Sequence, residues 1–262
     1  MFRVLSWGCG VQSTALAVLS ALGRLERVDV VVSADLGWER SRTYEAREWY
    51  RAWLGARGVP VEIVDSGDIR QLGGEDHVHM PFWTADGGPL RRQCTREFKV
   101  RPVRRRVREL MGYHGSRGPH PVAGSVEQWI GFSLDEEQRR SPSGVQYIVN
   151  RFPLVELRMT RNDCIEFLHG EGLLVPVKSA CIGCPYRRPS EWLEMRDQDV
   201  REFDDACEFD ELIRYGPLVQ RPESSVEADS VYVYRGRVPL GGADLVADSR
   251  RERRGSQLSM FV

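Results

Sequence analysis

The stretch that decides the fold is FRVLSWGCGVQSTALAVLSALG, residues 2–23. It opens with a short apolar run, residues 2–5, that is typical of a buried strand, and closes with an Ala- and Leu-rich run, residues 13–22, that has helical spacing. Gly8 and Gly10 lie between the two runs. A glycine-rich turn that leads from a strand into a helix leaves backbone amides unpaired, and the helix dipole favours an anion there. The stretch therefore predicts a strand, an anion site and a helix, in that order.

The alternation of strand and helix continues through the first half of the chain. Strands are expected at residues 28–33 and 59–64 and in a run that ends near Gly131, and helices at residues 43–56 and, after Pro102, within residues 96–110. Such alternation predicts parallel strands joined by crossover helices. We therefore expect an α/β fold, a doubly wound parallel sheet with a smaller C-terminal helical part.

Three segments are expected along the chain. Residues 1–150 form the nucleotide-binding α/β domain, and residues 151–245 form a C-terminal part with a cysteine-bearing turn at residues 181–184 and helices at residues 161–169 and 190–215. The highly charged residues 246–262 are expected to lack order, as chain ends often do.

The composition narrows the class of protein. The chain has 262 residues, with 37 basic and 38 acidic side chains and a formal net charge of -1, so its overall charge does not indicate a nucleic-acid binder. No stretch approaches the roughly 20 apolar residues that a membrane span needs, and the N-terminus lacks the pattern of a secretory signal. We expect a cytoplasmic protein without a membrane partner, in which the six cysteines are metal ligands, catalytic groups or core residues.

The glycine-rich loop suits a phosphate but follows neither common phosphate-binding pattern. No Gly-Lys-Ser/Thr follows it, and Ser13 stands where Gly-x-Gly-x-x-Gly would require a third glycine. Gly8 and Gly10 let the backbone approach a phosphate, and Ser6, Ser13 and Thr14 could add hydroxyl donors. The alternative is a tight turn capped by Ser13.

Residues 6–14, SWGCGVQST, resemble the PP-loop of the adenine nucleotide alpha-hydrolase superfamily, in the branch of phosphoadenylyl-sulfate reductase-like proteins of phages and bacteria. Further segments that match this branch are SADLGWE, PFWTADGGPLRRQCTREFKVRPV, IGFSLDEEQRR, RFPLVELRMTRNDC, KSACIGCPYR and EFDELIR. Two features depart from the pattern. Cys9 stands where many relatives carry another glycine, and the tail lacks the Cys- and Gly-rich extension of longer members.

The resemblance implies a site for ATP and Mg²⁺. The nucleotide-binding residues it implies are Ser6, Gly8, Gly10, Gln12, Ser13, Thr14, Asp35, Gly131 and Ser133. Three catalytic residues are expected. Asp35, at the end of the second strand, would organise the nucleotide or its Mg²⁺, and Arg139 would neutralise charge on departing pyrophosphate. Lys99, in a basic stretch that is otherwise a solvated helix face, would contact a phosphate; for Asp35 the alternative is a loop or helix-capping role.

Three cysteines are candidate metal ligands. Cys181 and Cys184 form a C-x-x-C followed by proline, and Cys94 lies among arginines that favour a thiolate. Three thiolates suit a [4Fe-4S] cluster with one iron left without a protein ligand. The alternatives are a structural zinc site, or cysteines with a redox or a purely structural role. Cys164 and Cys207 are expected to be core residues.

The resemblance implies an ATP-dependent sulfurtransferase, which adenylates a carbonyl-type oxygen of its substrate and replaces it with sulfur, using the iron-sulfur cluster to hold the sulfur that a sulfur donor supplies. The sulfur acceptor could be a nucleic acid, a nucleobase or a small metabolite. The chain could also form a homodimer. An adenylyl-sulfate reductase is the alternative enzyme, although no cysteine follows Cys207. The non-enzymatic alternative is a partner protein in nucleic-acid modification that binds an adenine nucleotide without turnover.

Overall fold

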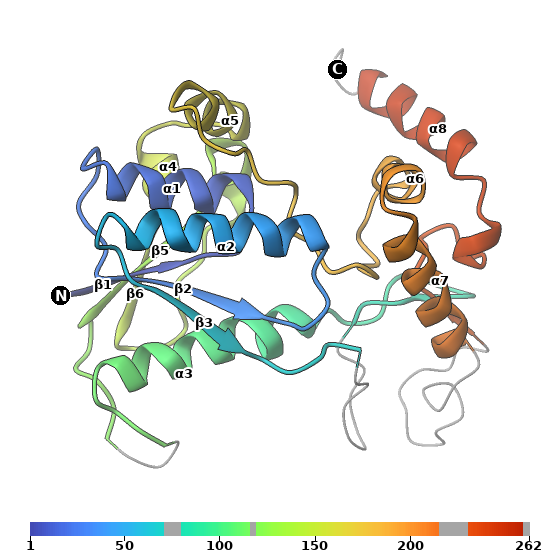
Figure 1. Cartoon of the computed structure of the whole chain (residues 1–262). Helices are drawn as coiled ribbons and strands as arrows, with labels where there is room; N and C mark the ends of the chain where they lie inside the picture. The colour runs from blue at the N-terminus through green and yellow to red at the C-terminus, as the bar shows by residue number, and fades with distance from the viewer. Residues whose placement is uncertain (71–79, 116–118, 215–229, 259–262) are drawn as a thin grey trace. The chain divides into compact units, whose positions relative to one another are not determined.

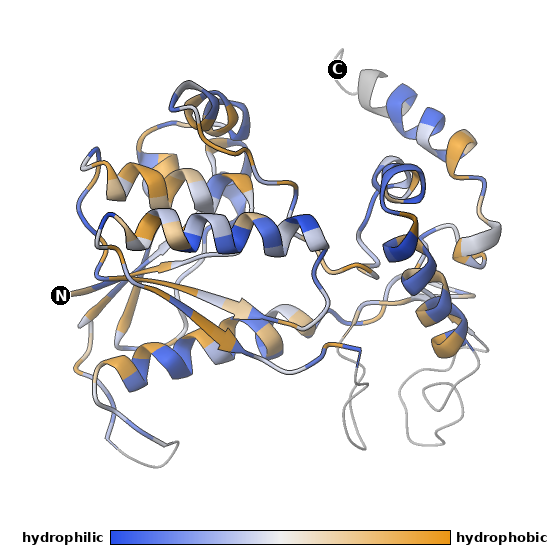
Figure 2. Ribbon diagram, in the orientation of Figure 1, coloured by the Kyte–Doolittle hydropathy of each residue, from blue (hydrophilic) through white to orange (hydrophobic). Residues whose placement is uncertain are grey.

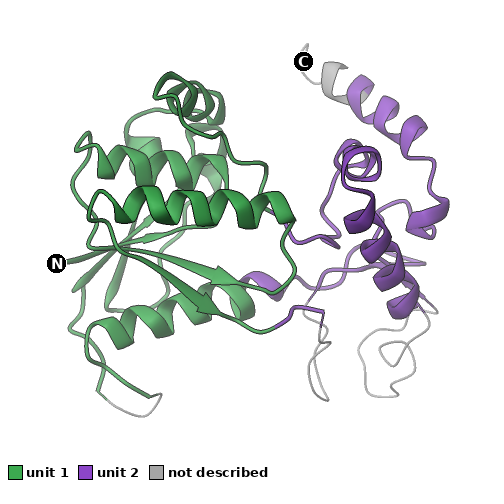
Figure 3. Ribbon diagram, viewed as in Figure 1, with its two compact units in different colours: residues 1–67, 96–179 green, residues 68–95, 180–262 purple. Residues whose placement is uncertain are grey.

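The structure, a computed structural model, describes residues 1–70, 80–115, 119–214 and 230–258 (Figure 1). The chain forms two compact units (Figure 3). Unit 1 consists of Met1–Gly67 and Arg96–Ser179, and unit 2 of Asp68–Thr95 and Ala180–Val262. These limits differ from the expected boundary at residue 150, because residues 151–179 belong to the sheet unit and residues 68–95 do not.

Unit 1 contains a five-stranded, all-parallel sheet in the order β3-β2-β1-β5-β6. The strands are β1 (Phe2–Ser6), β2 (Val30–Asp35), β3 (Val61–Asp65), β5 (Val126–Ile130) and β6 (Ile148–Arg151). The first four confirm the expected strands, whereas β6 was not predicted. Successive strands extend the sheet from β1 to β3 on one side and through β5 to β6 on the other. The order therefore reverses between β1 and β5, where open α/β sheets bind their ligands.

Helices cover both faces of this sheet, which confirms the doubly wound α/β fold (Figure 1). On one face lie α1 (Val11–Ala21), α2 (Ser41–Gly55), α4 (Pro153–Glu156) and α5 (Arg161–Gly170); on the other lies α3 (Arg101–Leu110), which follows a π-helical turn, η1 (Thr95–Val100). Alternate strand residues face opposite layers, so Leu5 packs with α1 while Val4 packs with α3. Both faces are buried, as a parallel sheet requires.

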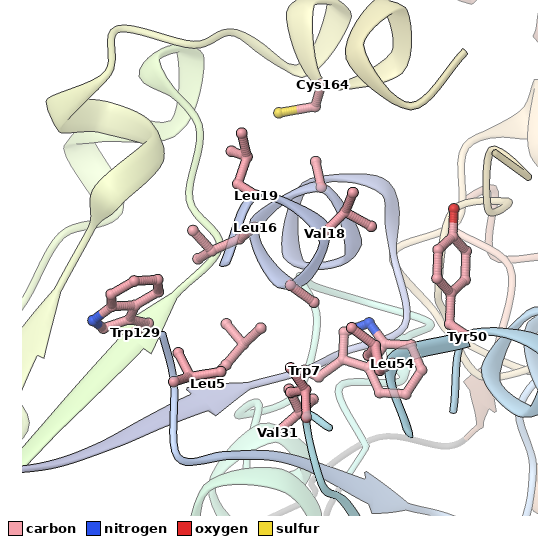
Figure 4. Packing of buried hydrophobic residues seen from close by; sticks show 14 of the residues in the cluster. Leu5, Trp7, Leu16, Val18, Leu19, Val31, Tyr50, Leu54, Trp129 and Cys164 are labelled. Atoms are coloured by element: carbon pink, nitrogen blue, oxygen red, sulfur yellow. The ribbon is translucent and has the colours of Figure 1, made fainter. Parts of the chain in front are cut away.

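The larger core lies between the sheet and α1, α2 and α5 (Figure 4). Leu16 and Val18 of α1, Leu54 of α2 and Cys164 of α5 are all fully buried in it. This confirms the expectation that Cys164 is a core residue. Figure 2 shows the hydrophobic residues of α1 and of the strands, with polar residues along the outer side of α2.

Unit 2 is mainly helical. It contains α6 (Pro189–Gln198), α7 (Val200–Arg214), α8 (Leu245–Leu258) and a 3-10 turn, η3 (Leu240–Gly242), with a two-stranded antiparallel sheet of β4 (Trp83–Thr84) and β7 (Val231–Tyr232). The single helix expected over residues 190–215 is two helices, because Asp199 leaves the helical conformation with φ -133° and ψ 57°.

The last stretch of the chain differs from the expectation that residues 246–262 lack order. Residues 245–258 form α8, and residues 259–262 lie outside the described part. Ser190 at the start of α6 donates its backbone N–H to Glu252 over 3.1 Å, and Tyr234 donates its hydroxyl to Asp248 over 2.6 Å. These bonds hold the charged helix on the rest of unit 2. Within the described ranges, no helix has both the length and the apolar composition of a membrane span.

Candidate functional site

The loop after β1 lies at the carboxyl edge of the sheet, where Ser6 pairs with Ile130 at the end of β5. Its first residue, Trp7, donates its backbone N–H to Val32 over 2.8 Å and its indole N–H to the Thr14 hydroxyl over 3.0 Å. Thr14 is fully buried. Although it was expected to contact the nucleotide, the structure uses its hydroxyl to orient Trp7 and so to fix the start of the loop.

The rest of the loop presents a run of unpaired amides. Among the described residues, none accepts a hydrogen bond from the backbone N–H groups of residues 8–13, and no side chain caps α1. A Cβ at Gly8 would meet nothing within 4 Å, and one at Gly10 would lie 3.7 Å from the Ser179 Cβ. Gly10 has an ordinary φ of -93°. The protein's own packing therefore does not require glycine at these positions, whereas a ligand that reaches the amides does.

Cys9, between the two glycines, is the strained residue of the loop. Its φ is 56°, in the left-handed region that favours glycine, and its side chain is buried. The thiol lies 3.4 Å from the Ser33 hydroxyl, and burial raises the pKa of Cys9 to about 12. Cys9 is thus a neutral thiol near neutral pH.

Gly131 brings the loop after β5 against the start of α1. A Cβ at Gly131 would lie 2.7 Å from the Cα and 2.8 Å from the backbone N of Ser13, far inside van der Waals contact. Ser13 itself donates its hydroxyl to Gly10 over 3.2 Å. Two residues predicted from separate motifs are thus neighbours, and only glycine permits the approach.

Gln12 connects the two loops further. Its amide N–H₂ donates to Glu136 over 3.1 Å and lies 3.4 Å from the hydroxyl of the buried Ser133. Its amide oxygen accepts a hydrogen bond of 2.8 Å from Arg161. The structure therefore gives the expected nucleotide-binding residues Gln12 and Ser133 partners within the protein, which hold the segment of residues 131–139 beside α1.

Arg139 lies in the short 3-10 helix η2 (Leu134–Arg139) of this segment. It pairs with Glu136, stacks over the Phe132 ring at 4.5 Å and remains half exposed. The neighbouring Asp135 accepts a hydrogen bond from the Arg161 backbone N–H over 3.0 Å. Burial raises the pKa of Asp135, but hydrogen bonds from Ser133 and Arg161 outweigh it and leave the pKa below its usual range.

Asp35, at the end of β2, is held within the protein. One carboxylate oxygen accepts from Arg47 at 2.8 Å, and the other from the Tyr44 hydroxyl at 3.0 Å and the Gly37 backbone N–H at 2.9 Å. Burial raises the pKa of Asp35, but these bonds outweigh it and lower the pKa overall. Because Arg47 already neutralises the carboxylate, Asp35 fits a Mg²⁺ ligand poorly.

A cavity of about 60 Å³ opens beside the loop, with room for a few water molecules or one tetrahedral oxyanion. The residues that line it are Ser6, Trp7, Gly8, Cys9, Ser33, Ala34, Glu39, Thr43, Tyr44, Arg47, Lys99, Val103 and Ser179. Lys99 pairs with the buried Glu39 over 3.2 Å, and Ser179 lies 3.5 Å from the same carboxylate. The expected cation Lys99 therefore does lie beside the loop.

Sequence reasoning missed the contribution of α2 to this cavity. Thr43, Tyr44 and Arg47 come from its first turns, and Thr43 and Arg47 lie on the same face of the helix as the buried Tyr50 and Leu54. The sequence did contain a signal for this. One face of the helix has polar residues at its N-terminal end and apolar residues further along. Polar side chains on a buried stripe indicate a site at that end of the helix.

The basic stretch of residues 91–108 is largely engaged within the protein. Arg101 pairs with Glu97, Arg104 donates to the Ser143 carbonyl, Arg106 pairs with Glu62 and Glu109, and Arg108 donates to the Pro119 carbonyl. These partners favour a structural role for the arginines of α3 over a surface for an acidic substrate.

The structure does not assemble the expected cluster ligands into a metal site. In the part of the chain that is described, no group of three or more His, Cys, Asp and Glu side chains is arranged to hold a metal ion. Cys181 is buried, and the Cys184 backbone N–H closes a turn onto its carbonyl over 3.2 Å. Burial raises the pKa of Cys184, and Cys94 lies near enough to add to that rise. All three lie in unit 2, but as found they do not fit a three-thiolate site.

No protein-family model matches the chain, and no curated protein matches it. Solved structures that are similar to it include the following two. The phosphoadenylyl-sulfate (PAPS) reductase from Candida auris, in a phosphate complex, is 10% identical over 67% of this chain and 74% of its own, with a TM-score of 0.40. The U34-tRNA thiolase NcsA from Methanococcus maripaludis, with its [4Fe-4S] cluster, is 12% identical over 80% and 71%, with a TM-score of 0.41. Similarity at this level of identity and TM-score does not assign an activity to this chain.

Proposed function

We propose that this chain is an ATP-dependent sulfurtransferase that cleaves ATP between its α- and β-phosphates. A carbonyl-type oxygen of the substrate attacks the α-phosphorus, the bond to the β-phosphate oxygen breaks, and pyrophosphate leaves with the electron pair. The adenylated oxygen is then a good leaving group that a sulfur nucleophile from a sulfur donor can displace as AMP. The observation that carries this proposal is the run of unpaired amides at residues 8–13, which includes two glycines that the protein's own packing does not need.

The loop favours pyrophosphate as a leaving group over transfer of the γ-phosphate. Residues 6–14 contain no lysine, so the loop lacks the Walker-type lysine that binds the β- and γ-phosphates during γ-phosphate transfer. Its amides and the N-terminus of α1 supply fixed dipoles to negative charge instead. Lys99 lines the adjoining cavity, and Arg139, half exposed beside α1, is our candidate for the cation that offsets charge as the bond opens.

No step is assigned to an iron-sulfur cluster, because the three cysteines are not gathered as a site. The identity of the sulfur donor and of the acceptor is open in this proposal. Reduction of an adenylyl sulfate is the competing activity, and it is distinguished by sulfite release from adenylyl sulfate in the presence of a thiol and without ATP.

The nucleotide site is tested by substituting the loop glycine that the fold does not need. We expect Gly10→Val to weaken ATP binding by on the order of 1 to 3 kcal/mol, because the side chain would cover amides that the ligand approaches. Isothermal titration calorimetry measures the affinity. The matched control is Gly55→Val, at the end of α2, where a Cβ would meet nothing within 4 Å. Unchanged ATP affinity in a folded Gly10→Val variant would place the nucleotide elsewhere.

A further inference from the structure

We propose that the cavity beside the loop is an oxyanion subsite for the terminal phosphate of the nucleotide, with Thr43 and Arg47 as its ligands. This inference rests on the proposed function, which it deepens. It assigns contacts to α2, a helix that the sequence motifs do not mark, and it assigns Asp35 the role of a positioning residue.

Thr43 provides the first observation. It is 3% exposed, it lines the cavity, and its hydroxyl has no hydrogen-bond partner among the described residues. Burying a hydroxyl without a partner is unfavourable, and native proteins rarely do so without a reason. A ligand oxygen in the cavity would satisfy the group. Thr43 also lies in the first turn of the 15-residue helix α2, whose dipole favours an anion at this end.

Arg47, one turn further along α2, provides the second observation. Its Nη1 donates to Asp35 over 2.8 Å, its Nε donates to Glu48 over 3.3 Å, and its guanidinium stacks over the Tyr44 ring at 4.8 Å. Within the described ranges, Nη2 donates to no acceptor. The side chain is only 12% exposed, and it lines the cavity. Its partners therefore fix the guanidinium and leave one terminal nitrogen for a ligand.

The charges around the cavity indicate how the cavity would bind an oxyanion. Arg47 is balanced by Asp35 and Lys99 by Glu39, so binding does not depend on a large net positive charge. It depends on directed donors, which are the Thr43 hydroxyl, the Arg47 Nη2 and the amides of Gly8 and Cys9. Such donors are typical of sites for phosphate and other tetrahedral oxyanions. The cavity of about 60 Å³ has room for such a group.

The test compares inorganic pyrophosphate with AMP by isothermal titration calorimetry. Thr43→Val and Arg47→Met should each weaken pyrophosphate binding about tenfold or more, because each removes a hydrogen bond to a charged ligand, and both should leave AMP binding unchanged. Asp35→Asn should also weaken pyrophosphate selectively, because Arg47 loses the charge that orients it. The control is Arg51→Met, on the same helix but 54% exposed, which should bind both ligands normally.

Thermal unfolding of the ligand-free variants separates binding from folding. Thr43→Val keeps the shape of the side chain and removes a hydroxyl without a partner, so its Tm should equal or exceed that of the parent protein. A lowered Tm with normal pyrophosphate affinity would make Thr43 a structural residue and overturn the proposal. So would absence of pyrophosphate binding to the parent protein, or equal losses of AMP and pyrophosphate affinity in Thr43→Val and Arg47→Met.

The subsite and the proposed function can fail separately. Normal pyrophosphate affinity in both variants, with AMP and pyrophosphate still formed from ATP, would overturn the subsite alone. Selective loss of pyrophosphate binding in both variants, with ADP formed from ATP, would support the subsite and overturn the proposed cleavage.

Discussion

Cys9 gives the phosphate loop a residue that its backbone conformation disfavours. A glycine would adopt the φ of 56° without strain, yet the chain places a thiol there, buried and 3.4 Å from the Ser33 hydroxyl. Both neighbours of Cys9 are glycines, and a Cβ would meet nothing within 4 Å at Gly8 and only ordinary contact with Ser179 at Gly10. The thiol therefore forms part of the cavity wall, and burial keeps it protonated.

The stability of the protein should fall at alkaline pH through Cys9. Burial raises its pKa from the ordinary 9.0 to about 12, so above pH 9 the unfolded chain releases this proton while the folded chain keeps it. The stabilisation is complete below pH 9 and is lost as the pH rises towards 12, by about 1.4 kcal/mol per pH unit. Urea unfolding at pH 8 and pH 10 should show a smaller loss in Cys9→Ala than in the parent protein. An identical loss in both would show that Cys9 ionises equally in the two states.

Other residues show how far the sequence could predict the site. Gly131 and Ser13 were predicted from separate motifs and are in contact, and Lys99 lies beside the loop. The partners of Asp35 could not be predicted, because Tyr44 and Arg47 reach it from a helix whose rotation depends on packing. Their hydrogen bonds hold Asp35 within the protein, at a position where the sequence predicts a residue that organises the nucleotide or its Mg²⁺.

At the scale of elements, the sheet was predictable where its strands are long apolar runs. Strands β1, β2, β3 and β5 each have five or six residues, and Pro60 and Gly124 mark the chain just before β3 and β5. The shorter β6, β4 and β7 were missed, since two to four residues carry too little periodicity and become strands by pairing with a neighbour. The break at Asp199 was missed because α6 and α7 have continuous helical patterns on either side of it.

The contact between β5 and α1 should tolerate no side chain at Gly131. Gly131→Ala places a Cβ 2.7 Å from a backbone atom of Ser13, so the end of β5 or the start of α1 must move. We expect a loss of about 1 to 3 kcal/mol in the free energy of unfolding, together with weaker ATP binding.

Chemical denaturation measures this change, with Gly170→Ala as the control. Gly170 lies at the end of α5, where a Cβ would meet nothing within 4 Å, so alanine there should be neutral or stabilising. A Gly131→Ala variant with the stability and ATP affinity of the parent protein would mean that the close approach is not needed.

At the scale of the whole molecule, the division into two units could not be predicted from the sequence. Unit 2 is assembled from residues 68–95 and from residues after 179, and β4 from the first stretch pairs with β7 from the second. Pairing across about 150 residues leaves no local signal in composition or spacing. One consequence is that Cys94, far from Cys181 and Cys184 in the sequence, belongs to the same unit as both.

The central claim about the molecule is that it breaks ATP between the α- and β-phosphates, and the products of ATP turnover test it most directly. Nucleotides and phosphates should be separated after incubation with ATP, Mg²⁺ and candidate acceptors, with a slow acceptor-independent reaction followed first. We expect AMP and pyrophosphate, and Arg139→Ala should lower turnover more than ATP affinity because its cation acts as the bond opens. With the true acceptor, heavy oxygen in its carbonyl should appear in AMP. ADP and orthophosphate as the main products would contradict the claim.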